Sequence, residues 1–249
     1  ERDEYGLGHA AEDIREQGSP LGETIKPVEL PQNLIYEDFI VPEEDENGSL
    51  VGITFKNEDE FNFAFDVVDA LARRKPNKLA MLHVDIDKNE RWFTFKDISR
   101  YSSRAANYFR SLGIKRGDKV MLVLRRHYQF WFAILALHKI GAVAIPATDQ
   151  LVQHDFEYRF ETAGVDAIVC TAFGHAAEHA ENAAKNCPTV KNLIMVGGKR
   201  DGWHDFDAEF RFFSDDYIRP PFDECPCGDD TMLMFFTSGT TGYPKIAAH

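Results

Sequence analysis

The sequence predicts an α/β protein, in which a mainly parallel sheet carries helices on both faces. From about residue 118 onward, short runs of continuous apolar residues alternate with helical patterns. Continuous apolar runs are typical of strands buried on both faces, and their alternation with helices indicates parallel crossover units. The 249 residues, 44% of them hydrophobic, supply enough core for one large or two ordinary domains.

The start of the chain differs from the remainder. Residues 1–66 carry 18 acidic against 4 basic side chains, a net charge of −14, whereas residues 67–249 carry 23 against 24. Residues 1–60 are also rich in Pro and Gly and show little periodicity, so we expect a mostly irregular segment there, with at best a short helix near 10–16. An α/β unit is expected over residues 61–249. Charge runs are usually solvated, which favours a surface layer over a docking tail.

The first ordered elements are expected to be a helix, a hairpin and a second helix. Phe63, Val67 and Leu71 follow one another at intervals of four, which predicts an amphipathic helix over residues 61–74. Two β-like runs, residues 79–86 and 92–95, flank a polar turn and predict a hairpin. In the next helix, over residues 94–113, Thr94 and Asp97 have the spacing of a capping box.

The parallel sheet and its helices account for the rest. We expect strands at residues 118–124, 142–148, 165–170, 192–198 and 231–238. Between the first four of these, helices are expected at residues 127–141, 154–164 and 175–186. The last strand reads "TMLMFFTS" and is expected to be buried.

Composition excludes several classes of protein. No basic stripe is present, so a nucleic-acid partner is not expected. The longest apolar run, residues 130–137, is too short to span a membrane, and the first residues show no signal peptide. The four cysteines, Cys170, Cys187, Cys225 and Cys227, form no CxxC pair, which fits a reducing, cytoplasmic location.

One short motif suggests a metal. The stretch "HAAEH" places His175 and His179 one helical turn apart with Glu178 between them, as in some zinc peptidases. The pattern is short, its helix is rich in Ala, Glu and Lys, and a further ligand would be needed. A zinc site is therefore the weakest of the alternatives.

The stretch "FFTSGTTGYPK" combines an apolar strand with a loop of Thr, Ser and Gly. Gly239 and Gly242 permit backbone angles and a close approach that other residues forbid. Hydroxyl donors come from Thr237, Ser238, Thr240 and Thr241, and Lys245 adds a positive charge. A strand that leads into such a turn gathers backbone N–H groups around an anion, so the loop suits a polyphosphate.

This stretch resembles the phosphate-binding signature of the adenylate-forming superfamily, which includes acyl-CoA synthetases. The segment "GIKRGDKVMLVLRRHYQFWFAILALHKIGAVAIPAT" and the preceding "TFKDISRYSSRAANYF" are similar to the early part of acyl-CoA synthetases. The stretches "NFAFDVVDALA", "IPAT" and "PKIAAH" look most like the medium-chain and acetate-type branch. The resemblance covers residues 61–249 and implies the N-terminal subdomain of the adenylate-forming fold.

The resemblance implies a reaction in which a carboxylate, ATP and coenzyme A give an acyl-CoA, AMP and pyrophosphate. It assigns the β- and γ-phosphates to Ser238, Gly239, Thr240, Thr241, Gly242 and Lys245. It also places Thr237 near Mg²⁺, and the family's catalytic lysine beyond this chain. We therefore expect an N-terminal part that is inactive alone, is loosely held over residues 239–249, and self-associates through uncovered apolar surface. The alternatives are another adenylate-forming ligase or a non-catalytic nucleotide-binding module.

Overall fold

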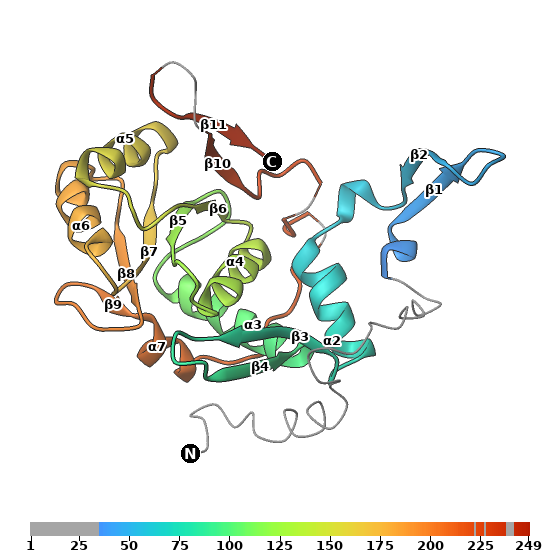
Figure 1. Cartoon of the computed structure of the whole chain (residues 1–249), viewed down its shortest axis with the longest axis horizontal. Helices are drawn as coiled ribbons and strands as arrows, with labels where there is room; N and C mark the ends of the chain where they lie inside the picture. The colour runs from blue at the N-terminus through green and yellow to red at the C-terminus, as the bar shows by residue number, and fades with distance from the viewer. Residues whose placement is uncertain (1–34, 222, 227, 238–241) are drawn as a thin grey trace.

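A five-stranded parallel sheet forms the centre of the computed structural model, which describes residues 35–221, 223–226, 228–237 and 242–249 (Figure 1). The strand order is β6-β5-β7-β8-β9, and every neighbouring pair is parallel. The strands are β5 (Lys119–Val123), β6 (Val143–Pro146), β7 (Ala167–Thr171), β8 (Asn192–Val196) and β9 (His204–Asp205). The predicted α/β fold class is confirmed.

Three helices connect the first four strands of this sheet. They are α4 (Gln129–Ile140), α5 (Gln153–Ala163) and α6 (Ala176–Asn186). The chain moves from β5 outward to β6 and then returns to place β7 on the other side of β5. The strand order therefore reverses between β5 and β7, which is where open α/β sheets form crevices at the carboxyl ends of their strands.

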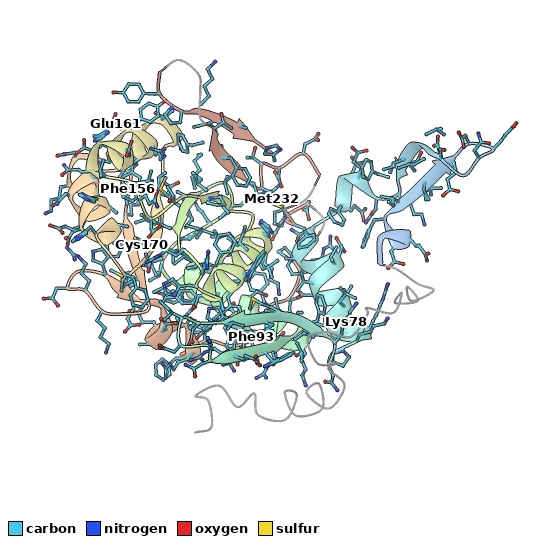
Figure 2. All side chains as sticks on the ribbon, in the orientation of Figure 1. Lys78, Phe93, Phe156, Glu161, Cys170 and Met232 are labelled. Atoms are coloured by element: carbon cyan, nitrogen blue, oxygen red, sulfur yellow. The ribbon has the colours of Figure 1, made fainter. Side chains whose placement is uncertain are left out.

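Each face of the sheet has its own core. The side chains of Met121 and Val123 pack with α5 and α6, whereas those of Val120 and Leu122 pack with α3 (Phe95–Ser111) and α4. This division follows from the period of two along a strand. Figure 2 labels Phe156 and Cys170 on the α5–α6 side.

The predicted hairpin and the helix that follows it are both present. Strands β3 (Leu79–Val84) and β4 (Glu90–Thr94) pair antiparallel beside α3. At the start of α3, the Thr94 hydroxyl accepts from the Asp97 amide at 3.2 Å, and the Thr94 amide donates to the Asp97 carboxylate at 2.9 Å. These reciprocal bonds are the predicted capping box, and they satisfy donors that a helix start would leave unpaired.

The helix predicted over residues 61–74 has a different geometry. It comprises η3 (Phe63–Asp69), which is a π-helix, followed by the short α2 (Ala70–Arg74). Phe63 was expected on the core face, but its side chain is 42% exposed. A π-helix has a wider turn than 3.6 residues, so a pattern read at the α-helical period assigns its faces wrongly.

The segment that we expected to be mostly irregular contains a second hairpin. Strands β1 (Ile40–Glu44) and β2 (Leu50–Phe55) pair antiparallel and project from the body of the protein (Figure 1). The Asp45 carboxylate accepts from the amides of Asn47 and Ser49 at 2.9 and 2.8 Å, which holds the turn. Irregular structure was therefore the wrong expectation for residues 40–55. The helix expected near residues 10–16 lies outside the described residues.

The remaining helices and strands of the described residues are short. They are η1 (Ile35–Asp38), η2 (Glu58–Glu60), α7 (Phe206–Glu209), η4 (Phe210–Phe212), β10 (Met234–Thr237) and β11 (Lys245–Ala248). No helix within the described ranges combines the length and the apolar character that crossing a bilayer requires.

Candidate phosphate-binding site

The predicted phosphate loop leaves from a small hairpin at the edge of the parallel sheet. Strands β10 and β11 pair antiparallel, with Thr237 opposite Lys245. The amide of Ala144 donates to the Met232 carbonyl at 3.0 Å, and Ala144 forms a parallel bridge with Leu233. These contacts attach the hairpin to β6, as Figure 1 shows.

Strand β10 is not the buried strand that we expected. Its side chains alternate between half-buried and exposed, and Phe235 is 39% exposed. The reason is that β10 pairs with β11 and lies at the edge of the sheet beside β6, so only one of its faces meets a helix. A continuous apolar run does not distinguish this position from a central strand.

The end of the chain is held more firmly than we expected. Residues 245–248 form β11, and the backbone of His249 exchanges hydrogen bonds with Leu233 at 2.9 and 3.0 Å. The expectation of a loosely held segment is therefore wrong for residues 245–249. Residues 239–241 lie outside the described part of the chain.

Helix α5 supports the hairpin from one side. Met234, Phe236 and Ile246 pack against the same core as α5. The Arg159 guanidinium lies 5.1 Å from the centroid of the Phe236 ring, which is the geometry of a cation–π contact. A second contact from α5 holds the chain at Tyr243 and Pro244, just before β11 begins.

That second contact involves Tyr158. Its hydroxyl donates to the Pro244 carbonyl at 2.9 Å, and its ring stacks on Tyr243 with centroids 4.6 Å apart. Sequence reasoning did not select Tyr158 or Arg159, because neither residue is adjacent to the loop in sequence. The only available signal was their position on a helix expected to cover the sheet.

The structure places three of the predicted site residues. The Thr237 hydroxyl donates to the Lys245 carbonyl at 3.3 Å, so these two residues meet at the base of the loop. Lys245 is exposed, and no carboxylate among the described residues forms an ion pair with it. Gly242 has φ +100°, a backbone conformation that favours glycine. Ser238, Gly239, Thr240 and Thr241 lie outside the described residues.

The HAAEH motif, the weakest of the alternatives, does not form a metal site among the described residues. His175 precedes α6 as its N-cap residue, and its Nδ1 lies 3.7 Å from the Glu178 carboxylate. Both side chains are largely exposed, and the described residues contain no group of three or more His, Cys, Asp or Glu that could hold a metal ion.

Residues 68–249, which include β10, the loop and β11, match the family described as AMP-binding enzyme. The chain belongs to the AMP-binding enzyme family. This confirms the resemblance that the closing motif suggested. The match covers the parallel sheet, its helices and the hairpin that carries the predicted phosphate loop.

Acyl-CoA synthetases are among the curated relatives of this AMP-binding protein. The mitochondrial acyl-coenzyme A synthetase ACSM5 of Rattus norvegicus is 33% identical over 198 residues, which is 76% of this chain and 33% of the relative. The mitochondrial ACSM1 of Mus musculus is 33% identical over 201 residues, 77% of this chain and 34% of the relative. The chain thus spans about a third of the length of the relatives it matches.

Solved structures agree on the fold. An anthranilate CoA ligase, AuaEII, in complex with anthranoyl-AMP superposes with a TM-score of 0.64 at 22% identity, over 76% of this chain and 35% of that one. The acyl-CoA synthetase of Brucella canis gives a TM-score of 0.62 at 24% identity, over 76% and 33%. These similarities show that this chain and the two solved structures share a fold.

Proposed function

We propose that this chain supplies the phosphate-binding part of an AMP-forming acyl-CoA synthetase. The reaction converts a carboxylate, ATP and coenzyme A into an acyl-CoA, AMP and pyrophosphate. The observation that carries the proposal is the pairing of Thr237 with Lys245 at the base of the loop, within the region that matches the AMP-binding family. The sequence similarity to acyl-coenzyme A synthetases supports the same reaction.

The residues at the base of the loop suit the first step of this reaction. Negative charge develops on the departing pyrophosphate, so fixed donors and cations lower the barrier. Lys245 supplies an exposed ammonium group, and Tyr158 fixes the backbone one residue before it, at Pro244. In this proposal Ser238, Gly239, Thr240, Thr241 and Gly242 add further donors to the β- and γ-phosphates.

A magnesium ion fits this site only if the nucleotide provides most of its ligands. Thr237 Oγ1 is one oxygen at the loop base, and the described residues form no cluster of acidic or histidine ligands. Mg²⁺ commonly binds in this way, through few protein oxygens together with phosphates and water. Thr237 therefore remains our proposed contact to the ion.

Two further expectations belong to this proposal. We infer a reducing, cytoplasmic compartment, supported by Cys170 and Cys187, which are free and buried.

We also infer self-association through exposed apolar surface, although the surface differs from the one first expected. Most of the run at residues 130–137 is buried, whereas Val51 and Phe55 of β2 are 67% and 60% exposed. Light scattering across a concentration series tests this, and a constant monomer mass would contradict it.

Nucleotide binding tests the central proposal. The 249-residue chain is titrated with MgATP by calorimetry, alongside the variants Lys245→Met and Lys191→Met. Lys191 is an exposed lysine before β8, so its variant changes the charge equally at a distance from the loop. We expect Lys245→Met to weaken binding at least fivefold and Lys191→Met to leave it unchanged. Equal affinities for the two variants would contradict the assignment of Lys245.

Activity is tested separately. We predict that the chain alone does not exchange pyrophosphate with ATP in the presence of carboxylates from acetate to dodecanoate. Robust exchange would show that the 249-residue chain contains a complete adenylation site. A chain that binds MgATP but does not exchange pyrophosphate is the expected result.

A further inference from the structure

A large apolar cavity lies along α4, on the α3–α4 side of the parallel sheet. Its volume is about 740 Å³, and it lies between β3, η3, α3 and α4. Along α4 the wall is built from Trp131, Ile134, Leu135 and His138, which recur at helical spacing. The hairpin β10–β11 packs with the other face of the sheet, so this cavity and the predicted phosphate loop lie on opposite sides.

The end of the cavity near the start of α4 is cationic. Arg125, Arg126 and His127, which follow β5, line this end together with His83 of β3. Three carboxylates are nearby, but each already has partners. Asp85, close to His83, accepts from the amide and the side chain of Asn89 at 2.8 and 3.0 Å. Asp149 pairs with Arg125 at 3.0 Å, and Asp207 accepts from the Gln129 side chain and the Gly197 amide at 2.7 and 2.8 Å. Arg126 is exposed, and no described carboxylate forms an ion pair with it.

The opposite end of the cavity contains a buried polar group without a partner. His138 is 7% exposed, and neither ring nitrogen has a hydrogen-bond partner among the described residues. Burial lowers the pKa of His138 to about 4, so the ring is neutral at physiological pH and offers one donor and one acceptor. Buried polar atoms are rarely left unsatisfied in native proteins, so this ring favours a ligand that can form a hydrogen bond with it.

A third buried nitrogen without a described hydrogen-bond partner, Nδ1 of His83, lies at the cationic end of the cavity. The Nε2 atom of His83 lies 3.1 Å from the Arg126 carbonyl, which can only accept, so Nε2 carries the proton. Its Nδ1 atom is buried and has no described partner. The cavity therefore has an apolar wall, a cationic end and unsatisfied imidazole nitrogens at both ends. Phe63, Met81 and Phe130 also contribute to its apolar surface.

We propose that this cavity binds a single anionic amphiphile, with the anionic head at Arg126, the unbranched chain along α4 and the far end at His138. The apolar wall favours the chain because its burial removes apolar surface from water. The unpaired guanidinium favours a carboxylate or sulfate head because charge-assisted hydrogen bonds to Arg are strong. No residue of the predicted phosphate loop contributes to this cavity, so the proposed site is distinct from that loop.

Binding of defined amphiphiles tests the proposal on the 249-residue chain. Sodium decanoate is titrated by calorimetry and by the fluorescence of Trp131, which lines the cavity and is 51% exposed. We expect saturable 1:1 binding of decanoate and at least tenfold weaker binding of decyltrimethylammonium, which has the same chain and the opposite charge. Equal binding of the two, or no saturable binding of decanoate, would overturn the proposal.

Variants locate the head and the middle of the ligand. Arg126→Gln should weaken decanoate binding at least fivefold, whereas the control Lys191→Gln should not change it. Ile134→Trp, which fills the middle of the cavity, should abolish binding while leaving the melting temperature within a few degrees. If either cavity variant bound decanoate like the unmodified chain, the assigned location would be wrong.

Two comparisons test the far end and the source of the ligand. A terminal hydroxyl can satisfy His138, so 10-hydroxydecanoate should bind several-fold more tightly than decanoate, and His138→Phe should remove this advantage. Equal affinities in the unmodified chain would overturn the placement at His138. Vesicles of phosphatidylglycerol should not sediment with the chain, because a cavity between β3 and α4 takes one free amphiphile at a time. Cosedimentation would instead assign the chemistry to a membrane surface.

Discussion

Lys139 of α4 and Asp69 of η3 form a buried ion pair, with Nζ 3.0 Å from Oδ1. The lysine side chain is fully buried, and its ammonium group also donates to the Ser103 hydroxyl at 2.9 Å. The Asp69 carboxylate accepts a second bond from Ser99 at 2.7 Å. The pair thus joins the π-helix to α4 and, through two serines, to α3.

Removing one partner of this ion pair should lower the free energy of unfolding substantially. We predict that Asp69→Asn lowers the free energy of unfolding by about 3 kcal/mol, because it leaves a buried ammonium group without its counter-charge. The matched control is Asp38→Asn, which breaks the exposed pair of Asp38 with Arg74. That variant should cost less than about 1 kcal/mol. Urea unfolding measures both, and similar losses would contradict the structural role of Lys139.

The neutral His138 ring should make stability depend on pH. The pKa of His138 falls from 6.5 to about 4 because the ring is buried. Between these two pKa values the unfolded state binds more protons than the folded state. The contribution of His138 to the free energy of unfolding is therefore complete above about pH 6.5 and is lost as the pH falls toward 4. The loss is about 3 kcal/mol for a shift of this size.

Two histidine variants isolate that contribution. In His138→Phe the fall in unfolding free energy between pH 7 and pH 4.5 should be smaller than in the unmodified chain. His175→Phe, at a side chain that is 85% exposed, should retain the full fall. Parallel pH profiles for the unmodified chain and His138→Phe would show that the ring is not buried in the neutral form.

Gly141, which ends α4, should tolerate a side chain poorly. It has φ +82°, and an added Cβ would lie 2.6 Å from the Cβ of Pro226. Gly113 ends α3 with a similar φ of +83°, but nothing lies within 4 Å of its added Cβ. Gly113→Ala should therefore cost about 1 kcal/mol from backbone strain alone.

Gly141→Ala adds a steric clash to the same strain. We expect a further loss of about 1–3 kcal/mol, as for overpacked sites. Thermal and urea unfolding of the two variants measure the difference directly. If both variants lost the same stability, the contact between α4 and Pro226 would not be tight.

Tyr158 should control the local stability of the hairpin β10–β11. Tyr158→Phe removes the hydrogen bond to Pro244 but keeps the ring, so residues 242–248 should open about fivefold more often, from a loss of about 1 kcal/mol. Tyr158→Ala also removes the stacking on Tyr243 and should increase opening further. Hydrogen exchange measures this, with the amides of β8 as the internal reference. Unchanged exchange in Tyr158→Ala would contradict support of the loop by α5.

Much of the fold could be predicted because local patterns determined it. The apolar runs at residues 118–124 and 165–170 became β5 and β7, and the capping box at Thr94 started α3 as expected. The signature at residues 235–245 identified the family, since its residue types at that spacing are specific to a phosphate loop. In each case the pattern that indicates the element lies in residues close together in sequence.

Other features depended on contacts between residues far apart in sequence. The π-helix η3 is joined to α4 by the buried pair of Asp69 and Lys139, which are 70 residues apart. The spacing of apolar residues near Asp69 does not indicate this distant partner. The edge position of β10 follows from its pairing with β11 and its bridge to β6. The cavity along α4 likewise requires β3, η3 and the β5–α4 loop to meet. The sequence alone determined the elements and the family, whereas the tertiary structure decided which surfaces those elements cover and which side chains are left without partners.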